Sequence, residues 1–241
     1  MTFRKSLLAI ATASLISQSG LVQAGVSAAE AAKLGAELTP TGAERAGNAD
    51  GSIPEWTGGM TQAPAGYQAG GTRIDPFANE QPLFTINASN YSQYADKLTV
   101  GQKALFQKYP DFEMPVYPTH RTFAAPQSVY DNTKANATRA ETTGGGNGVT
   151  QVFGGYPFPI PKNGHEAIWN HNLRWNGEGV NKVYGSMTVY SNGDITVGQG
   201  ELWESYPYYD SDSSLETFNG NSFQLIVQYA LPARRKGEVI L

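Results

Sequence analysis

The sequence predicts an α+β fold, mainly β, in which an antiparallel sheet curls over a core or a cavity. Three observations support this class. The chain has 27 Gly and 14 Pro but only 16% charged residues, which is typical of β-structure with many turns. Its C-terminal third alternates apolar and polar residues around Asn192-Gly193, a strong hairpin signal. Its N-terminal half contains only short helical segments between turn residues.

Residues 1–24 are predicted to form a cleavable signal peptide. Arg4 and Lys5 supply the positive charge, an apolar run follows, and Val22-Gln23-Ala24 supplies small residues at the cleavage site. The run covers only residues 7–16, whereas a transmembrane helix needs about 20 apolar residues. We therefore expect a protein exported to the periplasm that does not span the membrane once the signal is removed.

The composition narrows the classes of partner and anchor. The chain has no Cys, which excludes both disulfide bonds and a lipoprotein-type lipid anchor. The formal net charge of −4 becomes −6 when Arg4 and Lys5 are removed with the signal peptide. This mildly acidic balance argues against nucleic acid as a partner.

Residues 25–82 are expected to form a short helix and an extended arm. Ser27 and Glu30 form a capping box that predicts a helix to about Leu34. Breaker pairs such as Asp50-Gly51 then recur over residues 36–82. An ordered arm of this length has no core of its own, so it must lie over its own domain or over another chain.

Residues 83–241 are expected to contain helices followed by the first strands of the sheet. Asn163 is a good cap for a helix that contains Ile168 and His171. Gly144 to Gly148 indicates a flexible loop, either a linker or a mobile flap. The other predicted helices cover residues 90–97, 99–109 and 126–140, and the strands cover residues 182–190, 195–206, 223–231 and 238–241.

The strand pattern places Val183, Gly185, Met187 and Val189 on one face of the sheet. The chain stops at Leu241, in the middle of an apolar strand pattern. Because natural domains rarely end on an unfinished apolar edge, we expect this sequence to be a fragment of a longer protein.

No catalytic, metal or cofactor site is predicted. His165 and His171 are six residues apart, which is not the four-residue spacing that places two imidazoles on one metal ion from a helix. With His120 these are all the histidines, and their roles stay open. No nucleophile motif or phosphate-binding loop is present in the sequence. For the 163–175 helix, the simpler interpretation is packing through Ile168 and Trp175.

The proline-rich segment 154–161 has two interpretations. Alternating prolines hold the chain extended and present Tyr156, Phe158 and Ile160 at regular intervals. The segment is either a rigid strut that packs these side chains into its own core, or one rim of an apolar ligand cavity.

Several stretches resemble a known family in their order and spacing. They are Leu38 to Gly59 (LTPTGAERAGNADGSIPEWTGG), Pro115 to Thr122 (PVYPTHRT), Pro157 to Gly164 (PFPIPKNG) and Ile168 to His171 (IWNH). The chain resembles the domain of unknown function family number 1329, whose members are exported proteins of Gram-negative bacteria. Family members are longer, which agrees with a fragment. The resemblance implies a half-open antiparallel β-barrel of the LolA/LolB lipoprotein-carrier type, curled over helices, and incomplete in this chain.

The resemblance implies a periplasmic carrier or accessory protein for a lipid-like molecule that works with an envelope exporter. The expected partners are a hydrophobic small molecule or lipid, and an exporter or outer-membrane protein. A non-catalytic envelope interaction protein that docks through the arm is the alternative, and an envelope hydrolase is a further one. The candidate ligand-binding residues are Phe158, Trp169, His171, Trp175, Met187 and Val189.

Overall fold

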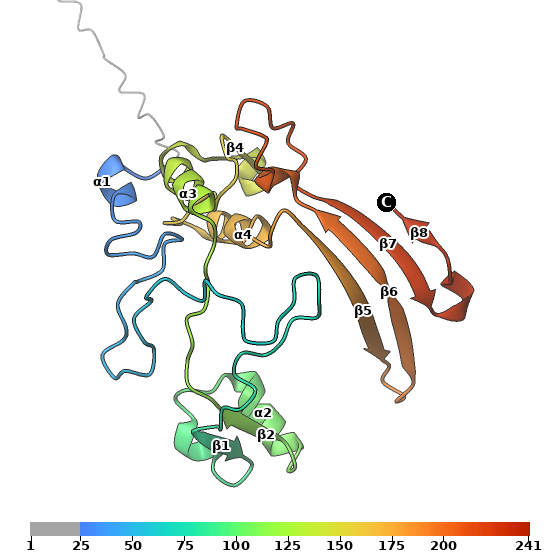
Figure 1. Ribbon diagram of the computed structural model, residues 1–241. Helices are drawn as coiled ribbons and strands as arrows, with labels where there is room; N and C mark the ends of the chain where they lie inside the picture. The colour runs from blue at the N-terminus through green and yellow to red at the C-terminus, as the bar shows by residue number, and fades with distance from the viewer. Residues whose placement is uncertain (1–24) are drawn as a thin grey trace, which may run out of the picture.

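A computed structural model describes residues 25–241 (Figure 1). The predicted signal peptide, residues 1–24, lies outside the described residues. Within the described part, no helix combines the length and apolar character that crossing a membrane requires. The chain forms a body, a small lobe, an irregular arm and an antiparallel sheet, which are described in turn.

The body consists of α1 (Ala28–Ala31), α3 (Gln127–Arg139), α4 (Gly164–Asn172) and the hairpin of β3 (Glu141–Thr143) and β4 (Gly148–Thr150). The predicted capping box is confirmed, since Ser27 Oγ accepts from Glu30 N and the Glu30 carboxylate accepts from Ser27 N. Helix α1 nevertheless ends at Ala31, before the predicted Leu34. The chain turns there, and Leu34 pairs with Leu38 in a bridge.

The body core forms around α3, which confirms the predicted 126–140 helix. Its periodic residues Val129, Thr133 and Asn136 are buried. Ala140, directly after the helix, is fully buried as well. The main cluster also contains Val152, Phe158, Leu173, Tyr208 and Tyr209.

The small lobe, residues 83–117, lies apart from the body at the end of two extended segments (Figure 1). It comprises β1 (Phe84–Asn87), η1 (Tyr91–Tyr94), α2 (Val100–Lys108) and β2 (Glu113–Val116), with β1 and β2 antiparallel. The predicted 99–109 helix is confirmed, and Thr99 and Gln102 form its capping box. The predicted 90–97 helix is only the short turn η1. Ile86, Leu98 and Phe106 form a separate small core.

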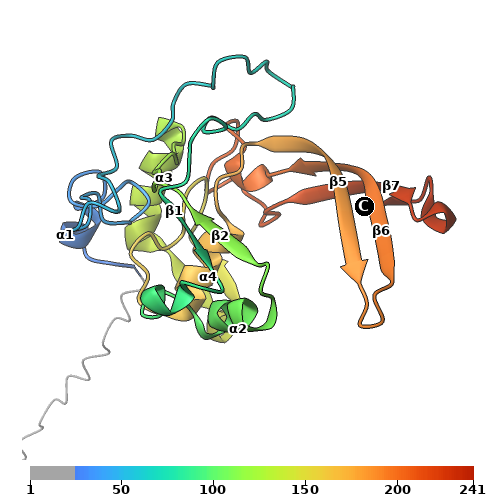
Figure 2. The same cartoon turned by 90° about the horizontal axis from the view of Figure 1, so that it is seen from below.

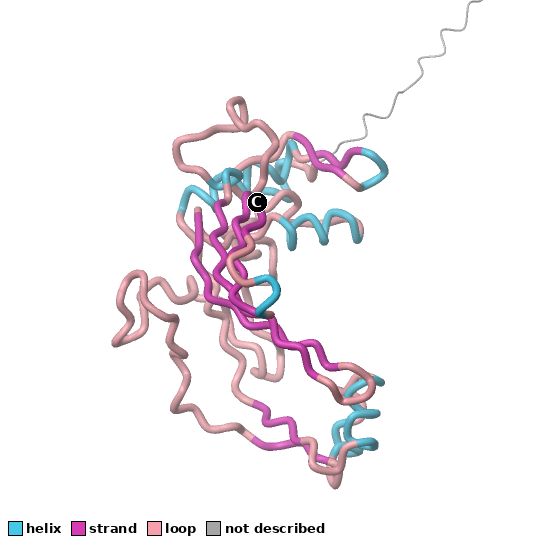
Figure 3. Tube along the Cα trace, turned by 90° about the vertical axis from the view of Figure 1, so that its right-hand side faces the viewer, coloured by secondary structure: helices cyan, strands magenta, loops and turns pink. Residues whose placement is uncertain are grey.

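The arm, residues 36–82, is irregular, as predicted, and Figure 3 shows it as loop. Its first part is held to the body by Arg121. The Arg121 guanidinium donates to the carbonyl oxygens of Glu44 (2.6 Å) and Arg45 (3.0 Å). Trp56 Nε1 also donates to the carbonyl oxygen of Phe123, at 3.0 Å. This part of the arm therefore lies over its own domain.

The sheet is antiparallel and has four strands, β5 (Gly179–Val189), β6 (Ile195–Ser205), β7 (Gln224–Leu231) and β8 (Val239–Ile240), in that order. The four predicted strands are thus present. Figures 1 and 2 show them as one curved, open layer that extends away from the helices. The described residues contain mainly antiparallel sheets with helices and no closed barrel, so the half-open barrel curled over helices is not confirmed.

The predicted β5–β6 hairpin is confirmed, but its turn is not the type I′ turn that Asn-Gly pairs readily adopt. Tyr190 N donates to the Asp194 carbonyl oxygen, and Gly193 N donates to the Tyr190 carbonyl oxygen, both at 2.9 Å. Gly193 has φ +88°, whereas Asn192 has no positive φ. The loop therefore has three residues, a type I turn followed by a left-handed glycine, and only that glycine needs the unusual conformation.

Two further expectations are wrong in detail. Gly144 to Gly148 is not a linker between elements that lie apart: it closes the β3–β4 hairpin, and Gly146 is buried. Helix α4 does not pack through Ile168, which is 50% exposed. It packs through Trp169, and Leu173 packs at its C-terminal end. The buried Glu166 carboxylate accepts a hydrogen bond from Lys162 N at 2.6 Å.

Candidate ligand-binding surfaces

The register of the sheet assigns its side chains to two faces. Directly paired residues on antiparallel strands point to the same side. The pairs Met187 with Val197 and Val189 with Ile195 therefore lie on one face, as does Trp203 with Ile226. We call this the apolar face. It also contains Val183 and Val239.

The side chains of the apolar face are exposed over most of its length. Val183 is 74% exposed, and Met187 and Val189 are each 65% exposed. Met187 and Val189, with Ile195 and Val197, form an apolar group near the hairpin tip, whereas Val183 lies further along β5, directly opposite Glu201. Uncharged surfaces of this kind mark binding sites more often than isolated exposed apolar residues do.

A second apolar group lies at the opposite end of the strands. A hollow of about 620 Å³ is found there, and Trp203, Ile226 and Phe223 contribute to it. Its other lining residues are Glu204, Ser205, Gln224, Leu225 and Leu241. Between the two groups, the paired residues Glu201 and Gln228 and their neighbour Gln199 form a polar band. The face is therefore apolar at both ends and polar in the middle.

The reverse side, which we call the polar face because Lys182, Thr188 and Glu204 lie on it, also contains the apolar residues Leu202, Leu225 and Val227. Tyr184 lies over Gly200, where an added Cβ would come within 3.0 Å of its ring. The Arg235 guanidinium covers the Tyr229 ring at 3.6 Å. Lys182 forms an ion pair with Glu204. Leu202, Leu225 and Val227 are half-buried, whereas Thr188 near the hairpin tip is exposed, so the most exposed apolar side chains of β5 and β6 lie on the apolar face.

The charges of the polar face are paired at its junction with the body. Burial alone would raise the pKa of Glu204, but hydrogen bonds from Lys182 and Tyr206 outweigh it and hold that pKa below its ordinary value. Burial, together with the bond to Glu204, raises the pKa of Tyr206 to about 12. Both groups therefore keep their usual charge at neutral pH.

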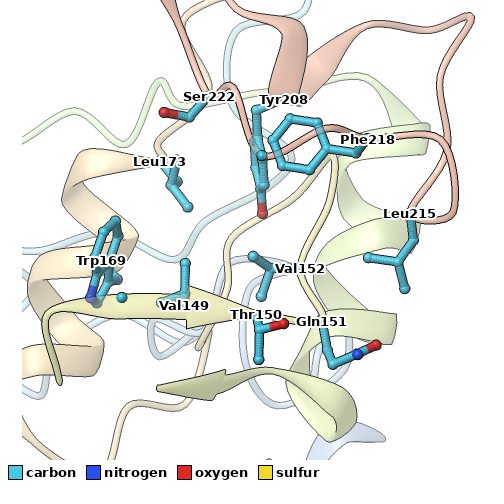
Figure 4. A pocket seen from close by; sticks show the side chains of 12 residues that line it. Val149, Thr150, Gln151, Val152, Trp169, Leu173, Tyr208, Leu215, Phe218 and Ser222 are labelled. Carbon is cyan, nitrogen blue, oxygen red and sulfur yellow. The ribbon is translucent and has the colours of Figure 1, made fainter. Parts of the chain in front are cut away.

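A separate pocket of about 440 Å³ lies in the body, between β4, α4 and the loop that leads to β7 (Figure 4). Trp169 and Leu173 line it from α4, and Val149 lines it from β4. The remaining lining residues are Gly148, Thr150, Gln151, Val152, Tyr208, Leu215, Phe218, Gly220 and Ser222.

The predicted ligand-binding residues do not come together in one site. Phe158 is buried in the body core, and its backbone N and O bond to the Asn170 side chain at 2.8 and 2.6 Å. This position fits the strut interpretation of the proline-rich segment. Trp169 lines the body pocket, whereas Trp175 packs edge-on against Tyr209 with ring centroids 5.0 Å apart.

The other three predicted residues lie elsewhere. His171 is exposed, and its backbone carbonyl accepts from the Arg174 guanidinium at 2.8 Å. Met187 and Val189 belong to the tip group of the apolar face. Phe223, Trp203 and Ile226 were missed. The alternation of β6 and the pairing of β7 place Trp203 and Ile226 on the Met187 face, but only the observed register shows it.

The three histidines lie in different environments. His120 stacks on Phe77 with centroids 3.8 Å apart, and its Nε2 lies 2.9 Å from a Glu80 carboxylate oxygen. His165 packs against Gly146, where an added Cβ would be 2.5 Å from its Cγ. No group of three His, Cys, Asp or Glu residues within 25–241 is arranged to hold a metal ion.

Comparison with known proteins gives a family but no activity. The family model described as "Protein of unknown function (DUF1329)" matches residues 85–241. The uncharacterized protein PA3922 of Pseudomonas aeruginosa is 43% identical over 226 residues, which is 91% of this chain and 49% of that relative. The chain thus spans about half the length of this relative. No solved structure matches. The chain belongs to the DUF1329 family of proteins of unknown function.

Proposed function

We propose that this protein is a non-enzymatic periplasmic carrier or accessory protein that binds a lipid-like molecule on the apolar face of its sheet. One observation supports this most directly. The apolar residues Val183, Met187 and Val189 are exposed on one face of a curved sheet, whereas Leu202 and Val227 on the other face are half-buried. Apolar burial favours binding by roughly 25 cal/mol per Å² of apolar surface removed from water.

The arrangement along this face favours an amphiphile over a simple hydrocarbon. The apolar group near the hairpin tip and the 620 Å³ hollow at the other end of the strands each offer apolar contacts. The polar band formed by Gln199, Glu201 and Gln228 lies between them. Amide groups donate and accept hydrogen bonds, so the band can bind a polar group of the same molecule. An acyl chain would then lie along either apolar end.

Two neighbouring residue pairs provide a matched test. Met187 and Val197 are directly paired on the apolar face, and the next pair, Thr188 with Thr196, points to the polar face. We expect the double substitution Met187→Asp and Val197→Asp to weaken binding of dansyl-undecanoic acid at least about tenfold, since losing about 1.4 kcal/mol suffices for that change. Probe fluorescence measures the affinity.

The control is Thr188→Asp with Thr196→Asp, which adds the same charges one residue away. We expect it to change probe affinity less than about twofold, a difference under 0.5 kcal/mol. Equal losses in the two double variants, or no probe binding to the unaltered protein, would refute the proposal. Lipid extraction and mass spectrometry of the full-length protein would then identify the natural molecule.

The alternative function is a non-catalytic envelope interaction protein that docks through residues 36–82 on an exporter or outer-membrane protein. Arg121 and Trp56 already hold the first part of this arm on its own domain. Only the part after about residue 60 would be available. Photocrosslinkers placed at Tyr67 and Ile74, both exposed, test this in cells. Capture of a defined envelope protein favours the alternative, and crosslinks only to the protein itself count against it.

A further inference from the structure

We infer that the body pocket is a second binding site, distinct from the apolar face, and that it takes a compact, uncharged molecule containing an aromatic ring. Figure 4 shows Trp169, Leu173, Val149, Tyr208 and Phe218 around the same space. The volume of about 440 Å³ lies within the range of small-molecule pockets, roughly 300–1,000 Å³.

The aromatic walls present carbon to the pocket because their polar atoms are already bonded elsewhere. Trp169 Nε1 donates to the Gly146 carbonyl oxygen at 2.9 Å. The Tyr208 hydroxyl donates to the Gly155 carbonyl oxygen at 2.6 Å. Phe218 meets Tyr208 edge-on, with ring centroids 5.6 Å apart. An inserted ring would extend this edge-to-face arrangement, which aromatic groups prefer.

The lining of the pocket favours neutral ligands over ionic ones. None of its twelve lining residues is Asp, Glu, Lys, Arg or His. A carboxylate or ammonium group would lose part of its hydration on entry and find no opposite charge among the lining side chains, which opposes its binding. A neutral molecule avoids that penalty, and this is the reason we assign an uncharged ligand class.

Hydrogen-bonding capacity remains at the pocket. Within residues 25–241 the side chains of Gln151 and Ser222 make no hydrogen bond. Gln151 also has φ +60°, and within residues 25–241 it is the only non-glycine residue with a positive φ. Such strained residues concentrate at ligand sites, where the conformation is held by the surrounding structure. Gln151 and Ser222 can bind a hydroxyl or carbonyl group of the ligand.

The wall that carries Gln151 is held in place by the body. His165 packs on Gly146 at the hairpin end, and the irregular segment that follows Gln151 is fixed by Asn136, whose Nδ2 donates to the Phe153 carbonyl oxygen at 3.1 Å. The pocket is therefore preformed, which lowers the ordering cost of binding.

A fluorine NMR titration tests this inference. The purified protein is labelled with 5-fluorotryptophan, and the Trp169 resonance is assigned with Trp169→Phe. We expect benzyl alcohol to shift that resonance saturably. Benzoate and benzylamine, its charged analogues, should bind at least about tenfold more weakly.

Two filling variants locate the site. Leu215→Trp, and separately Ser222→Trp, should abolish the benzyl alcohol response, while Val197→Trp on the sheet should leave it unchanged. Using two variants guards against one of them failing to fold. The inference is overturned if benzyl alcohol causes no saturable shift, if benzoate binds equally well, or if Val197→Trp removes the response. None of these results bears on dansyl-undecanoic acid binding to the sheet, so the two proposals can fail separately.

Discussion

The body and the sheet both contain regularly spaced apolar residues, but only the body buries them. In α3, Val129 and Ala137 are 3% and 4% exposed, whereas Val183 and Met187 in β5 are 74% and 65% exposed. Every buried side-chain nitrogen or oxygen in the described residues has a hydrogen-bond partner. The body thus uses its apolar residues for folding stability, whereas the sheet leaves its own exposed, and we propose that they bind a ligand. The predictions below test this division.

The largest effect we expect is a loss of folding stability at high pH, caused by the buried tyrosines of the body. Burial raises the pKa of Tyr208 and Tyr209 far above the ordinary value. A tyrosine whose folded-state pKa exceeds its unfolded value stabilises the fold below about pH 10, and that contribution is lost as the pH rises through the folded pKa. We expect the melting temperature to be constant from pH 7 to about 10 and to fall steeply towards pH 12.

Phenolate absorbance, followed with circular dichroism over the same pH range, checks this prediction. Tyr206, whose pKa is raised to about 12, should ionise together with the loss of structure or after it. Complete ionisation of all tyrosines in a fully folded protein near pH 11 would contradict the packing described for the body.

Truncating one large side chain in each region gives the next largest contrast. Tyr208 is 1% exposed at the centre of the body core. We expect Tyr208→Ala to lower the free energy of unfolding by about 3–5 kcal/mol, as for other buried aromatic residues. Met187→Ala should change it by less than about 0.5 kcal/mol. Urea denaturation measures both, and similar losses would show that the sheet face is also part of a core.

The hydrogen-bond network of α3 should contribute less than its apolar packing. Asn136 Nδ2 donates to the Phe153 and Gly155 carbonyl oxygens, and its Oδ1 accepts from the Arg139 guanidinium. Asn136→Ala leaves buried groups without partners, so we expect a loss of about 1–3 kcal/mol. Asn181→Ala, on an exposed strand position, is the control. An unchanged unfolding midpoint for Asn136→Ala would contradict the network.

The ion pair on the polar face should have the smallest effect. Lys182 is 45% exposed and Glu204 is 18% exposed, so solvent screens their attraction. We expect Lys182→Ala to reduce the free energy of unfolding by no more than about 1 kcal/mol and to leave probe binding unchanged. Thermal melts at low and high salt measure the first quantity. A loss of probe affinity would contradict the assignment of the binding surface to the apolar face.

The sequence predicted the local elements well because their signals are local. The Ser27, Thr99 and Asn163 caps, and the alternation in β5 and β6, depend on residues a few positions apart. The hairpin at Asn192-Gly193 was predicted, but its turn type was not. The pair is compatible with two loop lengths, and the strand register decides between them.

The candidate sites were less predictable because they depend on contacts distant in sequence. Trp169 and Trp175 are close in sequence, yet one lines the body pocket and the other packs on Tyr209. Tyr208 and Phe218 complete that pocket from beyond two strands of the sheet. Met187 and Val189 share the apolar face with Ile226 only through the pairing of β6 with β7. No local pattern contains that information.

The most direct test of the central claim is photolabelling with a fatty acid that carries a diazirine in its acyl chain. After irradiation, digestion and mass spectrometry locate the modified residues. The account predicts labels on strands β5, β6 and β7 at apolar-face positions such as Met187, Val197 and Ile226, and their loss on competition with unlabelled fatty acid. Labels at polar-face positions such as Thr188 and Thr196, labels confined to the body, or labelling that competitor does not reduce would contradict it.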